Sequence, residues 1–430
     1  MGLADWRKLV MGGRGGGLMG LPGLPLAIDF GASSLKLLQL THGAGGAEDD
    51  SPALVAAACL PTPDELVSDP AGRLAFQLEA LPRLVKSGGF RTRRAICSIP
   101  AGRTLCRHLQ LQTEPGAPLA ALVRSAVPAQ LKCDPSALVL RHFEVGQRSG
   151  KAEVICVAAA REFVEQLMRG MKESGLEPVG AHAEHTAMLR AFDSITRRIE
   201  DKDLTSLYLD IGAGLTKVVI AHGREIAFAR TIELAGLHLD QAVASQLKLV
   251  PQMAHAHRLA MPDVARKAPA AAAAAPAPPA PAVVPEGLAL LSAGLRRDGA
   301  ATAVMEDRRQ GQPAPGHRPA EPQRVPFSPP EADLSEPLEI LTDEISMCMR
   351  YHESVFPDQK INRAVFVGGE ARHLSLCQHI ARTLRLPAQV ADPMAGVART
   401  GKEQTPGVDF SEPQPGWAAT LGLCLSPTDL

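Results

Sequence analysis

One short pattern occurs twice in the chain, and it constrains the fold more than any other feature. Each copy is an apolar run that ends in Asp, followed by a glycine turn and then by Lys; the copies are residues 26–36 and 207–217. A second apolar run follows each Lys, so each copy predicts two buried strands joined by a tight turn. Because the copies have matched spacing and lie in opposite halves of the chain, they predict two lobes that clamp one nucleotide.

The turn between the Asp and the Lys has the composition of a phosphate site. Glycine allows a backbone to approach a ligand closely. Successive N–H groups with hydroxyls nearby form a concavity that binds anions. An Asp at the end of each strand is a suitable ligand for a cation or for its water shell. The sequence contains no GxxxxGK[ST] motif, so the chain is not a P-loop NTPase.

Size and composition exclude several classes of protein. With 430 residues the chain can form two or more domains. A net charge of -1 and an aromatic content of 3% argue against a nucleic-acid-binding protein. Eight cysteines without a CxxC pair predict reduced thiols in a cytosolic protein rather than a disulfide or metal framework. We find neither a signal-peptide core nor the run of about 18 apolar residues that spans a bilayer.

Alternating strand and helix patterns predict a mixed α/β chain. A strand–helix–strand unit follows Pro100, and a segment rich in Pro and Ala, with the composition of a disordered chain, interrupts the second half. The expected divisions are a flexible Gly-rich lead (1–23), a first lobe (24–98 and 151–204) containing an inserted subdomain (99–150), a second lobe (205–267 and 338–430), and the disordered insertion (268–337).

Two further features carry candidate site residues. Gly368 and Gly369 end a predicted strand, where the backbone can lie against a flat ligand, although a glycine pair after a strand is also an ordinary turn. Glu184 opens a predicted helix. It is either a first-turn carboxylate favoured by the helix dipole or a carboxylate that positions water or Mg²⁺ near a γ-phosphate, and the sequence leaves both readings open.

The paired D-x-G-x-x-x-x-K hairpins and the V-G-G strand end resemble the motifs of the actin/Hsp70/sugar-kinase ATPase fold. Within that fold the chain is most similar to the PilM family of type IV pilus assembly proteins, which is related to the division protein FtsA. Residues 29–40 (DFGASSLKLLQL) look like the family's opening D-I-G-S-S-S-V-K-L-V-E-L, and residues 361–372 and 386–393 resemble its adenosine strand and the segment after it. The implied fold is a two-lobed, actin-like (ribonuclease H-like) α/β fold with an inserted subdomain of the type called 1C.

By resemblance, ATP with Mg²⁺ binds in a cleft between the two lobes. Asp29 and Asp210 would face the metal, largely through water. Glu184 lies where the family carries its connecting element, and it is the tentative catalytic residue. The expected contacts to phosphate are Gly31, Ser33, Ser34, Lys36, Gly212, Gly214, Thr216 and Lys217. Those on the adenosine side are Gly368, Gly369 and Arg372, with Glu344 and Ser346 on the preceding helix.

The resemblance also implies a partner. PilM-like proteins bind the cytoplasmic N-terminal tail of PilN, an inner-membrane protein, here near residues 94–111 and 119–131. The expected function is a nucleotide-dependent scaffold of a type IV pilus or related type II secretion platform, with slow or no ATP turnover and with self-association as a further expectation. The residues 425–430 form no basic amphipathic helix, so the expected location is cytoplasmic, at the inner membrane only through partners. One departure is Ala235-Gly236-Leu237, which replaces the family's usual glycine pair.

Two other functions fit the same fold. A sugar-kinase-type phosphotransferase would need an Asp base in a sugar cleft, and the sequence offers no convincing one. An interaction module that has lost its nucleotide is the second alternative. The retention of Asp29, Asp210 and both lysines weighs against it.

Overall fold

The computed structural model describes residues 24–42, 51–113, 118–148, 150–193, 203–261 and 332–428. The predicted lead (1–23) and most of the predicted insertion (268–337) lie outside the described residues. The described end of that insertion is not an irregular segment. Helix α10 (Ser335–Val355) begins within it, so the second lobe resumes slightly earlier than the sequence predicted.

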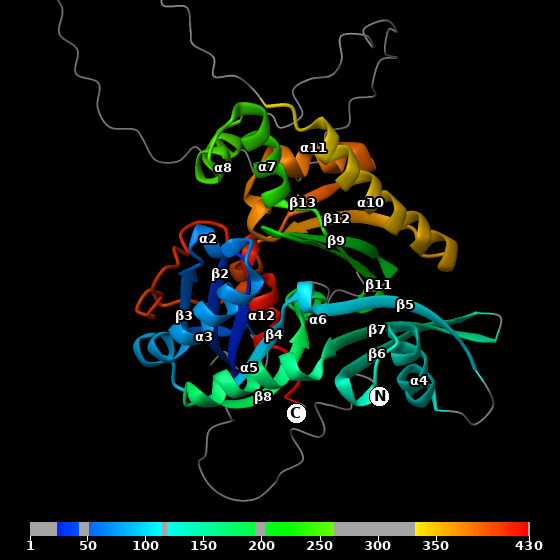
Figure 1. Ribbon diagram of the computed structural model, residues 1–430, viewed down its shortest axis with the longest axis horizontal. Coiled ribbons are helices and arrows are strands. Elements are labelled where there is room, and N and C mark those ends of the chain that lie inside the picture. Colours follow the sequence, from blue (N-terminus) through cyan, green and yellow to red (C-terminus); the bar gives the residue numbers. More distant parts are fainter. Residues whose placement is uncertain are drawn as a thin grey trace, which may run out of the picture. The chain divides into compact units, whose positions relative to one another are not determined.

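Each half of the chain forms a five-stranded sheet, and the two sheets have equivalent strand orders. Across each sheet, the first three strands are antiparallel to their neighbours, and the fourth and fifth strands run parallel to the third, central strand. The equivalence places the two predicted hairpins, β1–β2 and β9–β10, at matching positions (Figure 1). The first sheet is β3 (Ala53–Pro61), β2 (Ser34–Thr41), β1 (Leu26–Phe30), β4 (Arg94–Ile99) and β8 (Glu177–Ala183); the second is β11 (Glu225–Ile232), β10 (Thr216–His222), β9 (Thr205–Ile211), β12 (Ile361–Val367) and β13 (Ala388–Val390).

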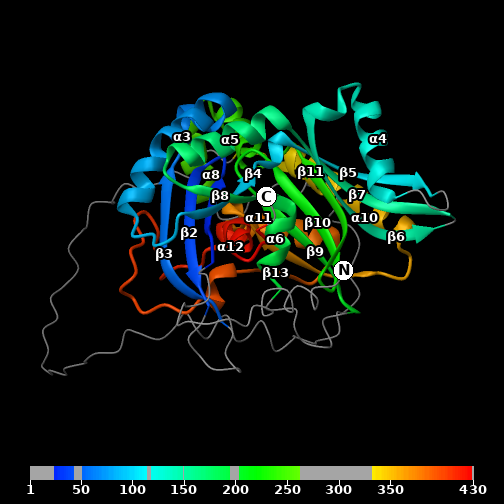
Figure 2. The same ribbon diagram turned by 90° about the horizontal axis from the view of Figure 1, so that it is seen from below.

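Helices cover both faces of each sheet, as continuous apolar strands require. In β1, Leu26 and Ile28 face the outer helices while Ala27 faces the space between the sheets. Figures 1 and 2 show the helices α6 and α12 in that space. The helix bounds are α2 (Asp64–Val67), α3 (Pro70–Ser87) and α5 (Arg161–Glu173) beside the first sheet, α7 (Gly236–Leu247), α8 (Pro251–Ala260), α10 and α11 (Leu374–Leu384) beside the second, and α6 (Glu184–Arg190) and α12 (Ala418–Cys424) between them.

The C-terminal segment returns from the second sheet to the first, unlike the predicted division that kept residues 338–430 in the second lobe. The backbone N–H groups of Leu54 and Cys59 donate to Ala398 and Pro406 at 2.9 and 3.0 Å, so this segment covers the edge of β3. The following helix α12 is buried on all sides and packs against β1, β2 and α6. A Cβ added at Gly422 would overlap the carbonyl of Ala187, so α12 meets α6 through bare backbone.

A third, three-stranded sheet has the order β5 (Thr104–Gln112), β7 (Lys151–Ala160), β6 (Leu138–Arg148), and α4 (Leu119–Leu131) packs on one of its faces. This sheet corrects the predicted subdomain boundary at residue 150, because β7 is its central strand. The interior of β7 is buried on both faces, and a continuous apolar run of this kind does not reveal which sheet it joins.

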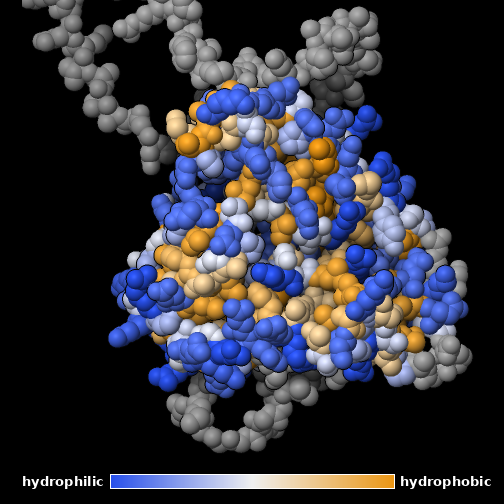
Figure 3. Space-filling model, in the orientation of Figure 1, coloured by the Kyte–Doolittle hydropathy of each residue, from blue (hydrophilic) through white to orange (hydrophobic). Residues whose placement is uncertain are grey.

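The face seen in Figure 3 is a mosaic of hydrophilic residues with separate apolar patches between them. Among the described residues, we find no helix that is both long enough and apolar enough to span a bilayer.

Candidate functional site

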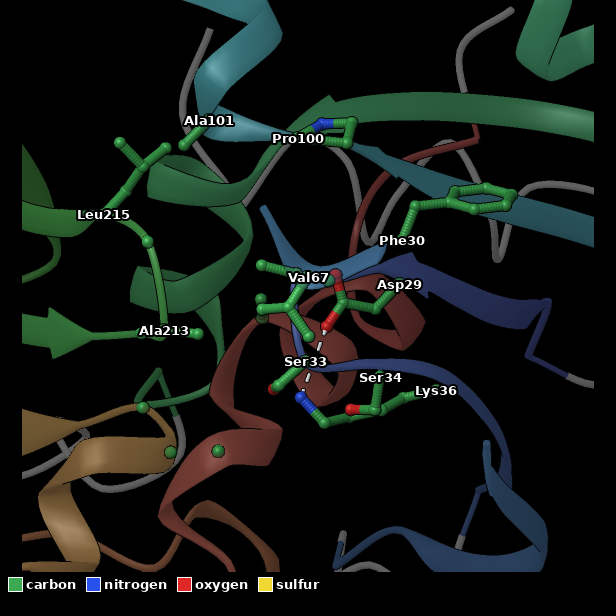
Figure 4. Close-up of a pocket in the computed structure, with 18 of the residues that line it drawn as sticks. Asp29, Phe30, Ser33, Ser34, Lys36, Val67, Pro100, Ala101, Ala213 and Leu215 are labelled. Carbon is green, nitrogen blue, oxygen red and sulfur yellow. Dashed lines mark ion pairs between the residues drawn. The ribbon is translucent and has the colours of Figure 1, made fainter. Parts of the chain in front are cut away.

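A cavity of about 1090 Å³ opens where the two hairpin turns meet, which is at the upper end of the size typical of small-molecule sites. In Figure 4, Ala213 and Leu215 of the second hairpin lie across the cavity from Asp29 and Ser33 of the first. The structure brings most predicted site residues to this cavity: Asp29, Gly31, Ser33, Ser34, Lys36, Glu184, Asp210, Gly212, Gly214, Lys217, Gly368, Gly369 and Arg372.

Strand register explains why each motif pairs an Asp with a Lys. Asp29 is directly opposite Lys36 in the β1–β2 ladder, and Asp210 is directly opposite Lys217 in the β9–β10 ladder. Opposite residues of an antiparallel pair point to the same face of a sheet. The Lys36 Nζ accordingly lies 3.8 Å from the Asp29 carboxylate (Figure 4), and the Lys217 Nζ lies 2.8 Å from that of Asp210.

Asp29 joins the cavity to the interior of the protein. Its carboxylate is 4% exposed and accepts hydrogen bonds from the Ser98 hydroxyl of β4 at 2.9 Å and from the Thr420 hydroxyl of α12 at 3.1 Å. The Ser98 oxygen in turn accepts the Phe30 N–H at 3.1 Å. Each carboxylate oxygen of Asp29 therefore accepts one hydrogen bond from the surrounding protein.

Lys217 is held between two carboxylates from different elements. Its Nζ donates to Asp210 at 2.8 Å and to Glu184, at the start of α6, at 2.6 Å, and all three side chains are nearly buried. Burial lowers the pKa of Lys217, but the charges and hydrogen bonds of Asp210 and Glu184 outweigh it and leave the pKa raised, so the ammonium stays charged. Burial raises the pKa of Glu184, and Lys217 opposes that shift.

His185 follows Glu184 and is fully buried. Its Nε2 lies 3.0 Å from the Thr231 hydroxyl. Burial, assisted by the charge of Lys217, lowers the pKa of His185 to about 4, so the imidazole is neutral at pH 7.

These side chains do not fit the magnesium site that was expected at Asp29 and Asp210. Mg²⁺ requires a near-octahedral set of oxygen ligands. The Lys217 ammonium already lies between Asp210 and Glu184, and each oxygen of Asp29 already accepts a hydroxyl hydrogen bond. Throughout the described ranges, no cluster of three or more His, Cys, Asp or Glu side chains is arranged to hold a metal ion.

Hydrogen bonds from the helices α3 and α7 hold the carbonyl groups of both hairpin turns. The Gln77 amide of α3 donates to the Gly31 carbonyl at 2.8 Å. The N–H groups of Gly236 and Leu237, at the start of α7, donate to the carbonyls of Gly212 and Ala213 at 3.3 and 2.7 Å. The backbone of Gly236 and Leu237 therefore anchors the second turn.

The Gly368-Gly369 turn lies beside Asp210, because β12 pairs in parallel with β9. Gly368 has φ = 93°, and a Cβ there would overlap the Ile211 carbonyl and the Asp210 carboxylate, so only glycine fits. Its N–H donates to the Pro415 carbonyl at 3.0 Å.

Three predicted contacts lie outside the cavity lining, and each has another partner. Thr216 is buried, and its hydroxyl donates to the Leu234 carbonyl at 2.6 Å. Glu344 of α10 forms an ion pair with Arg230 at 2.8 Å. Ser346, on the same helix, donates to the carbonyl of Thr342 at 2.7 Å.

The structure adds lining residues that the motifs did not indicate. One of them is Gln414 of the C-terminal segment, whose side-chain oxygen accepts a hydrogen bond of 2.7 Å from Arg372 at the cavity. Nothing in the local sequence marks that segment as part of a site, although the short helix after it, apolar except for Thr420, is typical of a buried element. The additions include Arg73 and Gln77 of α3, Gly102 and Arg103, and Gly407, Val408, Asp409, Glu412, Gln414, Gly416, Trp417 and Ala419.

The model of the family described as type IV pilus assembly protein PilM matches residues 27–262, more than half of the chain. No match is found among curated proteins. Among solved structures, the "PilM-PilN type IV pilus biogenesis complex" is 20% identical, with a TM-score of 0.62 over 93% of this chain and 97% of that chain. MreB 5 of Spiroplasma citri bound to AMPPNP is 13% identical, with a TM-score of 0.42 over 93% and 94%. EutJ from Carboxydothermus hydrogenoformans is 14% identical, with a TM-score of 0.40 over 94% and 90%. The predicted family and the predicted two-lobed, actin-like α/β fold are both confirmed.

Proposed function

Because the chain belongs to the family of type IV pilus assembly protein PilM, we propose that it acts as a nucleotide-dependent scaffold in the inner-membrane platform of a type IV pilus or a related secretion system. One observation carries the nucleotide part of this proposal: two hairpin turns of equivalent position line one cavity. Turn N–H groups and two lysines are suited to phosphate oxygens. The neighbouring glycine turn and Arg372, which line the same cavity, would contact the nucleoside.

We expect the bound ATP to be hydrolysed slowly or not at all. A general base has to reach the attacking water and accept its proton. Glu184, the candidate for that role, already accepts the Lys217 ammonium at 2.6 Å, and its carboxylate is nearly buried. This arrangement favours a scaffold over a kinase or a rapid ATPase.

Calorimetric titration of the purified chain with ADP and with a non-hydrolysable ATP analogue tests nucleotide binding. Lys36→Ala removes an ammonium that lines the cavity, and a charge-assisted hydrogen bond is worth about 1.5–3 kcal/mol. We therefore expect at least about tenfold weaker binding. Lys86→Ala, at an exposed position near the end of α3, is the matched control and should leave the affinity unchanged. Absence of binding to the unaltered protein would contradict the proposal, and phosphorylation of a sugar panel would favour the kinase alternative.

We further propose that the three-stranded sheet and α4 bind the cytoplasmic tail of a PilN-like inner-membrane protein, which would bring the chain to the membrane. A groove of about 70 Å³ lies between β5 and α4, within the two segments expected to bind this partner. The solved structure with a TM-score of 0.62 is of a PilM-PilN complex, which supports this choice of partner. The groove is lined by Leu105, Arg107, Leu109, Val127, Gln130, Leu131 and Cys156.

A charge placed at the exposed edge of the groove should weaken this interaction. Leu131 is 39% exposed, so Leu131→Asp should leave the fold intact while it weakens binding of a fluorescently labelled tail peptide at least tenfold. Leu374→Asp, on α11, is the control because Leu374 is 59% exposed and lies outside the groove. Equal loss in both variants would show that the groove is not the binding site.

A further inference from the structure

The two Asp–Lys pairs at the cavity differ in how firmly each ammonium is held. The Lys36 Nζ is 3.8 Å from Asp29, whereas the Lys217 Nζ is 2.8 Å from Asp210 and 2.6 Å from Glu184. The oxygens of Asp29 already accept two hydroxyl hydrogen bonds, so Lys36 remains available to a ligand. Lys217 is instead the common partner of two carboxylates.

The Lys217 ammonium lies where a divalent cation would bridge the carboxylates of Asp210 and Glu184. Asp210 ends the strand β9, Glu184 begins the helix α6, and the ammonium joins them across the cavity wall. A bound divalent ion would neutralise the same two carboxylates and would reduce their repulsion of a phosphate. The ammonium has three N–H donors, of which two are used. Because Lys217 lines the cavity, its third donor can face a phosphate oxygen.

We infer that the Lys217 ammonium takes the place of a divalent cation in this site, so that the protein binds a nucleoside di- or triphosphate without requiring Mg²⁺. The inference rests on the proposed nucleotide binding and specifies its electrostatics. A metal ion could enter between Asp210 and Glu184 only by displacing an ammonium that is nearly buried, and the displaced side chain would lose both its ion pairs. The raised pKa of Lys217 is consistent with an ammonium that persists at working pH.

Two measurements on the full chain test the inference. In the first, ADP is titrated by calorimetry in buffers that contain either excess Mg²⁺ or EDTA. We expect the two dissociation constants to agree within about threefold for the unaltered protein. A loss of more than about tenfold in EDTA would overturn the inference. If ADP binds in neither buffer, the proposed nucleotide function fails, and the second measurement still decides the question of the cation.

The second measurement uses Mn²⁺ alone, detected by electron paramagnetic resonance on the nucleotide-free protein. Lys217→Met frees the two carboxylates, and we expect this variant to bind one Mn²⁺ at least about tenfold more tightly than the unaltered protein does. Lys217→Arg keeps the positive charge and should bind Mn²⁺ no better than the unaltered protein. If Lys217→Met does not fold, strong Mn²⁺ binding by the unaltered protein that is lost in Asp210→Asn overturns the inference, and its absence supports it. Equal Mn²⁺ affinity of the unaltered protein and a folded Lys217→Met variant also overturns it.

Discussion

At the scale of single residues, Asp29 connects the cavity to the core. Its carboxylate is buried and accepts hydrogen bonds from the hydroxyls of Ser98 and Thr420. These two residues belong to a strand and a helix that are distant from Asp29 in the sequence. A buried charge is tolerated only when hydrogen bonds compensate its lost hydration. The position of α12 between the sheets therefore supplies one of the hydrogen bonds that compensate the burial of the Asp29 carboxylate.

Thr420→Val tests this role. The change preserves shape but leaves one oxygen of Asp29 without its donor, and an unsatisfied buried polar group costs about 1–3 kcal/mol. We expect urea unfolding to show a loss of stability in that range. Thr383→Val, at an exposed position on α11, should change stability by less than about 0.5 kcal/mol. Equal effects of the two variants would contradict the assigned role of Thr420.

A second prediction at this scale concerns pH. Burial lowers the pKa of His352 to about 4, so the folded protein keeps this imidazole neutral. An unfolded His has a pKa of about 6.5, and the unfolded chain therefore binds the extra proton between these values. His352 therefore lowers the free energy of unfolding progressively as the pH falls from about 6.5 toward about 4, and it has no such effect above pH about 6.5.

His352→Gln should therefore flatten the dependence of the melting temperature on pH between about 6.5 and 4, compared with the unaltered protein. His42→Gln is the control, because His42 is exposed. Parallel pH profiles for the His352→Gln variant and the unaltered protein would contradict the prediction.

At the scale of elements, α8 braces the Gly368-Gly369 turn. Arg258 of this helix is fully buried and donates from Nε to Asp240 of α7 at 2.6 Å. Its two terminal nitrogens donate to Glu370, next to the turn, at 2.7 and 3.1 Å. A bidentate guanidinium–carboxylate pair fixes orientation as well as distance. One side chain thus ties α8 and α7 to the loop that follows the Gly368-Gly369 turn at the cavity.

Arg258→Met should be strongly destabilising, because it leaves Asp240 and Glu370 buried without their cation. Removing one partner of a buried ion pair costs about 3–5 kcal/mol. Gln252→Met, at an exposed position on the same helix, should cost less than about 0.5 kcal/mol. Urea unfolding at pH 7 measures both. A loss below about 1 kcal/mol for Arg258→Met would show that the buried pair contributes little.

At the scale of the whole molecule, the repeated hairpin motif predicted two lobes that face one site, and its resemblance to the motifs of the actin/Hsp70/sugar-kinase ATPase fold predicted the fold. Its spacing places Asp and Lys opposite each other in both ladders. The path of the C-terminal segment could not be predicted in this way, since the apolar helix α12 carries no local mark of the sheets it packs between. A continuous apolar run does not reveal its neighbours, so residues 151–160, which form β7, were placed in the first lobe rather than in the inserted subdomain. No local pattern pairs Lys217 with Glu184 or Arg258 with Glu370.

The three-stranded sheet contacts the second lobe partly through an aromatic cluster and partly by direct packing of β5, β6 and β7 against β11. The Tyr351 hydroxyl of α10 lies 2.9 Å from Nδ1 of His108 on β5, and their rings meet edge to face at 5.4 Å. The Tyr351 ring also lies 5.7 Å from that of Phe228 on β11. On the other side of His108, Nε2 lies 3.2 Å from the buried Glu153 carboxylate of β7. The sheet therefore depends on α10 and β11 for part of its packing.

Tyr351→Ala should weaken the packing of β5 and of β11 against α10 at the same time. Aromatic pairs contribute about 0.5–1.5 kcal/mol beyond their buried area, and a neutral hydrogen bond contributes a similar amount. We expect lower stability and faster amide hydrogen exchange in β5 as well as in α10 and β11. Tyr351→Phe should retain the ring contacts and show a smaller change. Met347→Ala, on the same helix and 40% exposed like Tyr351, should affect α10 alone. If amide exchange in β5 stays unchanged in Tyr351→Ala, the cluster does not couple the sheet to the second lobe. Removal of the ring would then alter exchange only in the second lobe.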